Sequence, residues 1–162
     1  MTSSAPLPAA SERVRAALEA SGVEARIVAF DRGTRTAADA AAAIGCQVAQ
    51  IAKSLVFRSS PSGRAVLVIA SGVNRVDESK IASALGESIG KADAEFVRDK
   101  TGFAIGGVPP VGHAERPVIF IDQDLFKFAE IWAAAGTPNT VFRLTPDSLV
   151  AMTAGTVMIV SG

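Results

Sequence analysis

The chain has 162 residues, of which 49% are hydrophobic and 6% aromatic, and its sixteen basic and sixteen acidic side chains cancel. Length and composition are typical of one folded domain that buries its core without disulfides or metals. The balanced charge excludes a global field that would draw the protein onto DNA or an anionic membrane. A single cysteine, with no signal-peptide pattern and no membrane-length apolar run, predicts a cytoplasmic protein.

Caps, glycine stops and apolar periodicity predict alternating helices and strands. In chain order we expect a flexible tail over 1–10, a helix capped by Ser11 and ended by Gly22, a strand over 25–30, and a helix over 37–44 capped by Thr36 with Asp39. Strands over 51–58 and 64–71 follow, and then helices that begin after Asp77 and Asp93 and stop at Gly86 and near Gly102. The last elements are strands over 118–122, 130–134 and 140–144, a helix from Pro146 and a strand near Val157. The proline-glycine turn 59–63 indicates a hairpin. We therefore predict one α/β domain over 11–162, with a mixed, largely antiparallel, barrel-like sheet surrounded by helices.

The inventory of reactive side chains excludes several chemistries. One histidine and one cysteine cannot supply the three or four ligands that a zinc site needs at local spacing, so no metal is expected. A Ser-His-Asp or Cys-His arrangement would have to use His113, and the chain has no Gly-x-Ser-x-Gly elbow to expose a nucleophile, so such a triad is the less favoured alternative. The chain also has no phosphate-binding loop and no strand-linked Gly-x-Gly-x-x-Gly, so nucleotide hydrolysis and dinucleotide redox chemistry have no support. Cys46 follows an alanine-rich helix and is interpreted as a small buried hydrophobe rather than a nucleophile.

The segment 101–113 is unusually rich in glycine and proline, with Gly106, Gly107, Pro109, Pro110 and Gly112 in a run of seven residues. Glycines let a ligand approach the main chain, and free backbone amides stabilise an oxyanion during ester cleavage. The same composition also suits a tight connection between a helix and a strand. Composition alone leaves both interpretations open.

Lys53 lies on the predicted strand 51–58, where period-two alternation places it beside Ile51 and Leu55 and opposite Ala52 and Ser54. A lysine that faces inward is costly unless it is paired or used. The alternative is a lysine whose stem crosses the sheet while its ammonium reaches water. Lys53 is therefore a candidate for the site, with an ordinary structural role still open.

Four motifs follow one another along the chain: Ala52-Lys53-Ser54-Leu55, Val76-Asp77-Glu78-Ser79-Lys80-Ile81, Thr101-Gly102-Phe103 and Gly106-Gly107-Val108-Pro109-Pro110-Val111-Gly112. In type and order, these motifs resemble those of YbaK-like domains, which include the editing insertion of bacterial prolyl-tRNA synthetases and its freestanding relatives. It covers roughly residue 36 to the C-terminus. It implies the family's α/β barrel-like fold and hydrolysis of a wrong amino acid from tRNA, related to proline or alanine decoding, without a metal or nucleotide cofactor.

The resemblance also implies roles for individual residues. Lys53 would hold the terminal adenosine and its phosphate, and the backbone of Gly106 and Gly107 would surround the scissile carbonyl. The implied substrate contacts are Val108, Pro109, Pro110, Gly112, His113 and Ala134, with a supporting role outside the site open for His113. The expected partners are the aminoacyl-tRNA acceptor end and a synthetase, but no DNA and no membrane.

One departure from the family leaves the substrate open. Some members carry a serine where this chain has the segment 131–136, whose alanines offer no hydroxyl. Basic residues that could contact tRNA are Arg32, Arg35, Arg58, Lys91, Arg98 and Lys100, without preference among them, and Trp132 is interpreted as core. A non-catalytic module that binds aminoacyl-tRNA or a synthetase, and a hydrolase of small esters, are the alternative functions.

Overall fold

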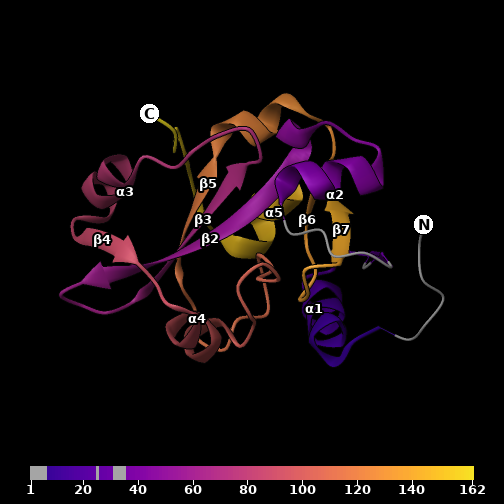
Figure 1. The fold of residues 1–162 in the computed structure, drawn as a ribbon, viewed down its shortest axis with the longest axis horizontal. Helices are drawn as coiled ribbons and strands as arrows, with labels where there is room; N and C mark the ends of the chain where they lie inside the picture. Colours follow the sequence, from indigo (N-terminus) through magenta and orange to yellow (C-terminus); the bar gives the residue numbers. More distant parts are fainter. Residues whose placement is uncertain (1–6, 25, 31–35) are drawn as a thin grey trace.

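In the described part of the chain, eight strands form one mixed sheet in the order β1-β7-β6-β2-β3-β5-β8, and β4 pairs with β2. Figure 1 labels all of these strands except β1 and β8. The computed structural model describes residues 7–24, 26–30 and 36–162. The strands are β1 Ile27–Ala29, β2 Ile51–Ser60, β3 Ala65–Ser71, β4 Ser88–Lys91, β5 Val118–Asp122, β6 Ile131–Ala134, β7 Thr140–Leu144 and β8 Thr156–Met158. The pairs β1–β7, β2–β3, β2–β4 and β6–β7 are antiparallel, and β2–β6, β3–β5 and β5–β8 are parallel. The expected mixed, mostly antiparallel sheet is therefore confirmed.

Within the described ranges, five α-helices and two short 3-10 helices accompany these strands. They are α1 Ala9–Ala20, α2 Ala37–Ile44, η1 Val48–Gln50, α3 Glu78–Leu85, α4 Ala94–Thr101, η2 Gln123–Lys127 and α5 Pro146–Thr153. The capping box of Thr36 and Asp39 forms as predicted, and Asp77 and Asp93 accept hydrogen bonds from the first turns of α3 and α4. In the described part of the chain, no helix is both long and apolar enough to cross a bilayer.

The start of the first helix differs from the prediction. α1 begins at Ala9 after Pro8, and no side chain caps it, so Ser11 lies inside the helix. Ser11 is buried and its hydroxyl donates to Thr140 Oγ1 over 3.1 Å. The expected tail thus gives way to helix at Ala9, and residues 1–6 lie outside the described residues.

Strand β4 was not expected, because Ser88–Lys91 is short, polar and contains Gly90. It forms because β2 continues to Ser60, two residues beyond its predicted end, and pairs Phe57–Ser60 with β4. Long-range pairing therefore creates this strand, with no support from local propensity.

Alternation along the strands divides the core into two layers. Leu67, Ile69 and Ile121 face the larger cluster, which also contains side chains of α1, α4 and α5. Val66, Val68 and Phe120 face the opposite cluster, which contains Ile81 of α3. Helix α2 packs separately against Ile51 and Trp132. β2 runs obliquely through the molecule in Figure 1, whereas β7 runs nearly upright, and β2 pairs with β6 only at Ile51 and Ala52.

Candidate functional site

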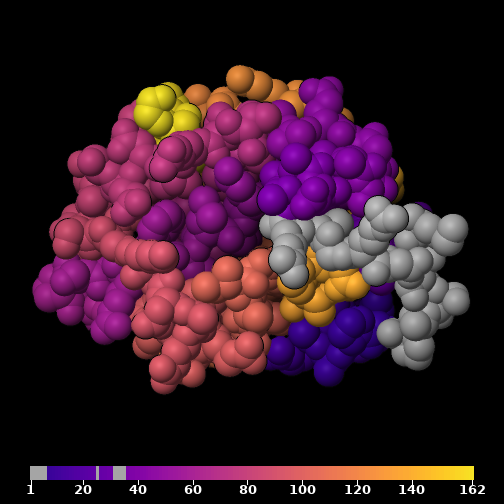
Figure 2. All heavy atoms as spheres, in the orientation of Figure 1, coloured from indigo at the N-terminus to yellow at the C-terminus, as the bar shows by residue number. Residues whose placement is uncertain are grey.

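A cavity of about 320 Å³ lies where β2 separates from β6. β2 pairs with β6 only at Ile51 and Ala52 and with β4 only from Phe57 onward. Among the strands described, residues 53–56 are therefore paired with β3 alone and present a free edge on the other side. Figure 2 shows the surface hollowed over β2, above the segment that follows α4.

The backbone of this free edge points into the cavity. Gly72 N donates to Ile51 O and Ser59 N donates to Arg64 O, so the odd-numbered residues of β2 make the hydrogen bonds with β3. Because N–H and C=O groups alternate in direction along an antiparallel strand, those of Ser54 and Val56 point away from β3. The cavity wall thus offers backbone donors and acceptors as well as side chains.

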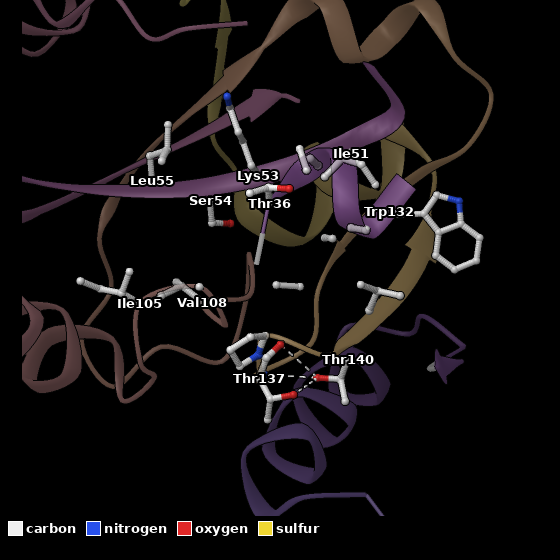
Figure 3. Close-up of a pocket in the computed structure, with 18 residues that line it drawn as sticks. Thr36, Ile51, Lys53, Ser54, Leu55, Ile105, Val108, Trp132, Thr137 and Thr140 are labelled. Carbon is white, nitrogen blue, oxygen red and sulfur yellow. Dashed lines mark hydrogen bonds between the residues drawn. The ribbon is translucent and has the colours of Figure 1, made fainter. Parts of the chain in front are cut away.

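Lys53 and Ser54 leave β2 on opposite sides. Figure 3 shows Lys53 and Leu55 rising on one side of the strand while the Ser54 side chain points to the other, toward Val108. This confirms the predicted alternation. Both residues line the cavity.

The Lys53 ammonium is half-buried and has no hydrogen bond or ion pair within the described residues. Burial lowers the pKa of Lys53, and the carboxylate of Asp122 partly offsets that lowering. Lys53 on β2 lies opposite Ala70 on β3. Ile69 on β3 lies beside Ile121 on β5, so the next residues, Ala70 and Asp122, are also neighbours. Lys53 and Asp122 therefore flank the small side chain of Ala70 on one face of the sheet. Asp122 is itself buried and accepts from Ser71 N (3.0 Å), Asn74 Nδ2 (2.8 Å) and Asp124 N (2.9 Å). The Lys53 ammonium therefore feels the fixed negative charge of Asp122 but forms no ion pair with it.

Ser54 differs from the other hydroxyl groups around the cavity. Thr36 Oγ1 accepts from Asp39 N as the cap of α2, and Thr137 Oγ1 and Thr140 Oγ1 lie 2.7 Å apart within the β6–β7 turn (Figure 3). Ser54 Oγ, in contrast, is buried without a hydrogen-bond partner among the described residues. A buried hydroxyl without a partner costs stability, and this makes Ser54 Oγ a candidate ligand contact at the cavity wall.

The glycine-proline segment contributes to the cavity only through its first part. Ile105, Gly106 and Val108 line it. Gly106 N has no acceptor among the described residues, whereas Gly107 N donates to Ala104 O over 3.0 Å. A Cβ on Gly107 would lie 2.7 Å from Thr137 Cα, so this glycine allows the loop to pack against the β6–β7 turn. Gly107 thus shapes the site by close packing, and its N–H is already engaged.

The later part of the same segment lies elsewhere. Pro110, Gly112 and His113 line a separate cavity of about 380 Å³ beside α1 and α5. His113 Nε2 lies 2.6 Å from Pro109 O, and burial lowers the pKa of the His113 imidazole despite this contact. The structure therefore does not bring His113, Pro110 or Gly112 to the cavity that contains Lys53, and Pro109 lines neither cavity.

The remaining predicted residues fall in three places. Ala134 lines the Lys53 cavity together with Ala133, as expected from its place on β6. Trp132 is half-buried, packs against the α2 cluster and also lines the cavity, so it is only partly core. Cys46 is half-buried in the same cluster, and burial raises the pKa of its thiol, which disfavours a nucleophilic thiolate. Arg32 and Arg35 lie outside the described residues.

Sequence reasoning missed several cavity residues that come from distant segments: Thr36, Ser54, Ile105, Thr137, Pro138 and Thr140. Only Ser54 carried a usable signal, because a serine adjacent to Lys53 on a strand must face the other side of the same wall. Within the described residues, no three His, Cys, Asp or Glu side chains gather as metal ligands.

Comparisons with known proteins identify the family of the chain. The profile of the aminoacyl-tRNA editing domain family matches residues 31–152. The uncharacterized protein YwhH of Bacillus subtilis is 32% identical over 123 residues, which are 76% of this chain and 78% of YwhH. The proline–tRNA ligase of Limosilactobacillus fermentum is 35% identical over 97 residues, which are 57% of this chain and only 17% of the ligase.

Solved structures extend the similarity to nearly the whole chain. One, described as a candidate trans-editing enzyme for prolyl tRNA synthetase, is 44% identical with a TM-score of 0.92, over 97% of this chain and 99% of that chain. Another, from work on grafting epitopes onto scaffold proteins, is 41% identical with a TM-score of 0.91, over 96% of this chain and 99% of the other. Since the family profile spans most of the sequence and these structures share its fold, the chain belongs to the aminoacyl-tRNA editing domain family of the YbaK type.

Proposed function

We propose that this protein is a trans-editing hydrolase that deacylates a mischarged aminoacyl-tRNA related to proline or alanine decoding. The observation that carries this function is the free edge of β2, where Lys53 and Ser54 line one cavity from the two sides of the strand. Among the described residues, the Lys53 ammonium has no ion pair and the Ser54 hydroxyl has no hydrogen-bond partner, and the backbone groups of the edge are unpaired. The family match and the similarity to a candidate prolyl trans-editing enzyme support the same reaction. The cytoplasm, where tRNA is charged, is the compartment that fits this role.

The residues at the cavity suit hydrolysis of an activated ester by water. Lys53 would hold the terminal adenosine and its phosphate at the mouth of the cavity, since a half-buried ammonium binds an anion more strongly than one in bulk water. Water attacks the ester carbonyl, the C–O bond to the ribose breaks, and the ribose oxygen leaves with a proton. The developing oxyanion needs donors, and Ser54 Oγ, Gly106 N and the β2 edge amides are the available ones.

Lys53→Ala tests the role of the ammonium. We expect kcat/KM for a mischarged tRNA to fall about 10- to 100-fold, the range for loss of a charged hydrogen bond. The free energy of unfolding should stay the same or rise, because the variant removes a half-buried charge without an ion pair among the described residues. The measurement is a deacylation screen over a panel of mischarged tRNAs with wild type and variant side by side. A wild type that cleaves none of them would end the enzyme proposal, and tight tRNA binding without cleavage would favour a binding module.

Ser54→Ala separates a ligand contact from a structural one. The Ser54 hydroxyl has no protein partner in the described part of the chain, so its removal should not lower the free energy of unfolding. If the hydroxyl donates to substrate, kcat/KM should fall about 3- to 10-fold, the equivalent of one neutral hydrogen bond. Unchanged deacylation together with unchanged stability would remove Ser54 from the site.

A further inference from the structure

The Lys53 cavity continues along the free edge of β2 into a second compartment. This compartment has a volume of about 290 Å³ and shares Ser54, Leu55, Ile105, Gly106 and Val108 with the first. The residues that line this compartment but not the first include Glu78, Lys91 and Val97. The two compartments therefore form one groove, with the Ser54–Leu55 backbone along its length.

The far end of this groove is basic. Lys91 also lines a third hollow, together with Arg58 and the β2–β3 turn, and no carboxylate lines that hollow. Lys91 is exposed, and neither it nor Arg58 has an ion pair within the described residues. The Arg58 guanidinium carbon lies 5.1 Å from the centre of the Phe96 ring, which holds the side chain at this end while leaving its N–H groups free.

The length of the groove suits a single nucleic-acid strand. At about 3.3 Å per residue, β2 covers about 17 Å between Lys53 and Arg58, a distance that several stacked nucleotides at about 3.4 Å each would span. Ile105 is 58% exposed where the two compartments meet, which offers an apolar surface for a base. Glu78 lines the same compartment as Lys91, and its carboxylate suits a ribose hydroxyl or a base amino group rather than a phosphate.

We propose that this groove binds the single-stranded 3′ end of the tRNA, with Lys91 and Arg58 contacting backbone phosphates upstream of the terminal adenosine. The inference rests on the proposed function, because the strand is placed by the ester it carries into the Lys53 cavity. The proposal assigns the phosphate contacts to Lys91 and Arg58 and not to the other basic residues of the chain. Lys100, by contrast, pairs with Glu115 over 3.3 Å.

The test compares two substrates that carry the same ester: a mischarged tRNA, and adenosine esterified with the same amino acid. The variants are Lys91→Ala, Arg58→Gln and the double variant. Lys127→Ala is the matched control, because Lys127 is an exposed cation that lines none of these cavities. For the double variant we expect kcat/KM on tRNA to fall about tenfold and its logarithmic salt dependence to weaken by about 1.4, at about 0.7 per phosphate contact.

Turnover of the adenosine ester should stay within about twofold of wild type, which also verifies that the variants fold. If kcat/KM falls equally on both substrates, or if kcat/KM on tRNA matches that of the Lys127→Ala control, the proposed tRNA binding in the groove is wrong. The deacylase proposal would remain intact. A wild type that cleaves neither substrate would overturn the proposed function itself, and the groove with it.

Discussion

At the scale of single residues, we expect the local environment of Lys53 to set the pH range of the proposed reaction. Its ammonium lies in a partly buried position, which lowers the pKa, beside the Asp122 carboxylate, which offsets part of the lowering. The charged form, which would bind the phosphate, is present below this pKa and is lost as pH rises through it. We therefore expect kcat/KM to decline on the alkaline side at a lower pH than an ordinary lysine would give.

Asp122→Asn should move this alkaline decline to still lower pH, because it removes the charge that favours the ammonium. Lys53→Arg, if it retains activity, should abolish the decline, because a guanidinium stays charged. The measurement is the pH profile of kcat/KM from about pH 7 to about pH 10, corrected for uncatalysed ester hydrolysis. An alkaline limb that is identical in wild type and Asp122→Asn would show that Asp122 does not act on Lys53.

Some of these residue properties were readable from the sequence and others were not. The alternation that separates Lys53 from Ser54 follows from strand geometry alone. The lack of a partner for Ser54 Oγ and the proximity of Asp122 do not, because both depend on which strands pair across the sheet. Likewise, the close spacing of Gly106 and His113 in sequence did not show that they face different cavities.

At the scale of elements, two glycines allow three backbone segments to stack beneath the site. A Cβ on Gly136 would lie 2.9 Å from Ala10 C and O at the start of α1. A Cβ on Gly107 would lie 2.7 Å from Thr137 Cα and 2.8 Å from Gly136 O. The β6–β7 turn is therefore held between α1 and the glycine-proline segment, and these contacts fix the floor of the cavity.

Gly107→Ala should separate the glycine-proline segment from this turn. We expect the free energy of unfolding to fall by about 1–3 kcal/mol, the cost of overpacking a close contact, and deacylation to fall with it as Gly106 and Val108 shift. Urea unfolding and deacylation assays measure both effects. Gly90→Ala is the stability control, because nothing lies within 4 Å of a Cβ there. Equal stability of the two variants would mean that the loop moves without cost.

Short-range sequence signals, such as helix caps and terminal glycines, predicted most of the helices and strands. The caps of α2, α3 and α4 and the glycines that end them lie where side-chain chemistry placed them. β4 and the first turn of α1 were missed because one is created by pairing with β2 and the other by packing against the β6–β7 turn.

At the scale of the whole molecule, α1 belongs to the core although it lies outside the segment that the family profile matches. Val14 and Leu18 are fully buried in the larger cluster, with β3, β5, β6 and β7. Ser11 adds a buried hydrogen bond to Thr140 in the turn at the cavity. The helix thus supports the site from behind without lining the Lys53 cavity.

Leu18→Ala tests this support. A cavity at a fully buried leucine costs about 2–5 kcal/mol of unfolding free energy, so the urea midpoint should fall strongly in one cooperative transition. Glu19→Ala is the neighbouring control, since it removes only an exposed ion pair with Arg15 and should cost about 0.5 kcal/mol or less. Similar stability of the two variants would show that α1 is only loosely attached.

The sequence by itself determined the fold class, the helix caps, the alternation on β2 and the motifs that carry the family resemblance. All of these depend on backbone periodicity and on side chains within a few positions of one another. Only the tertiary structure decided which residues share the cavity. β2 leaves β6 after two paired residues, and this divergence brings α2, the glycine-proline segment and the β6–β7 turn to one free edge. Such a gap results from the twist and register of the whole sheet, which no local pattern specifies.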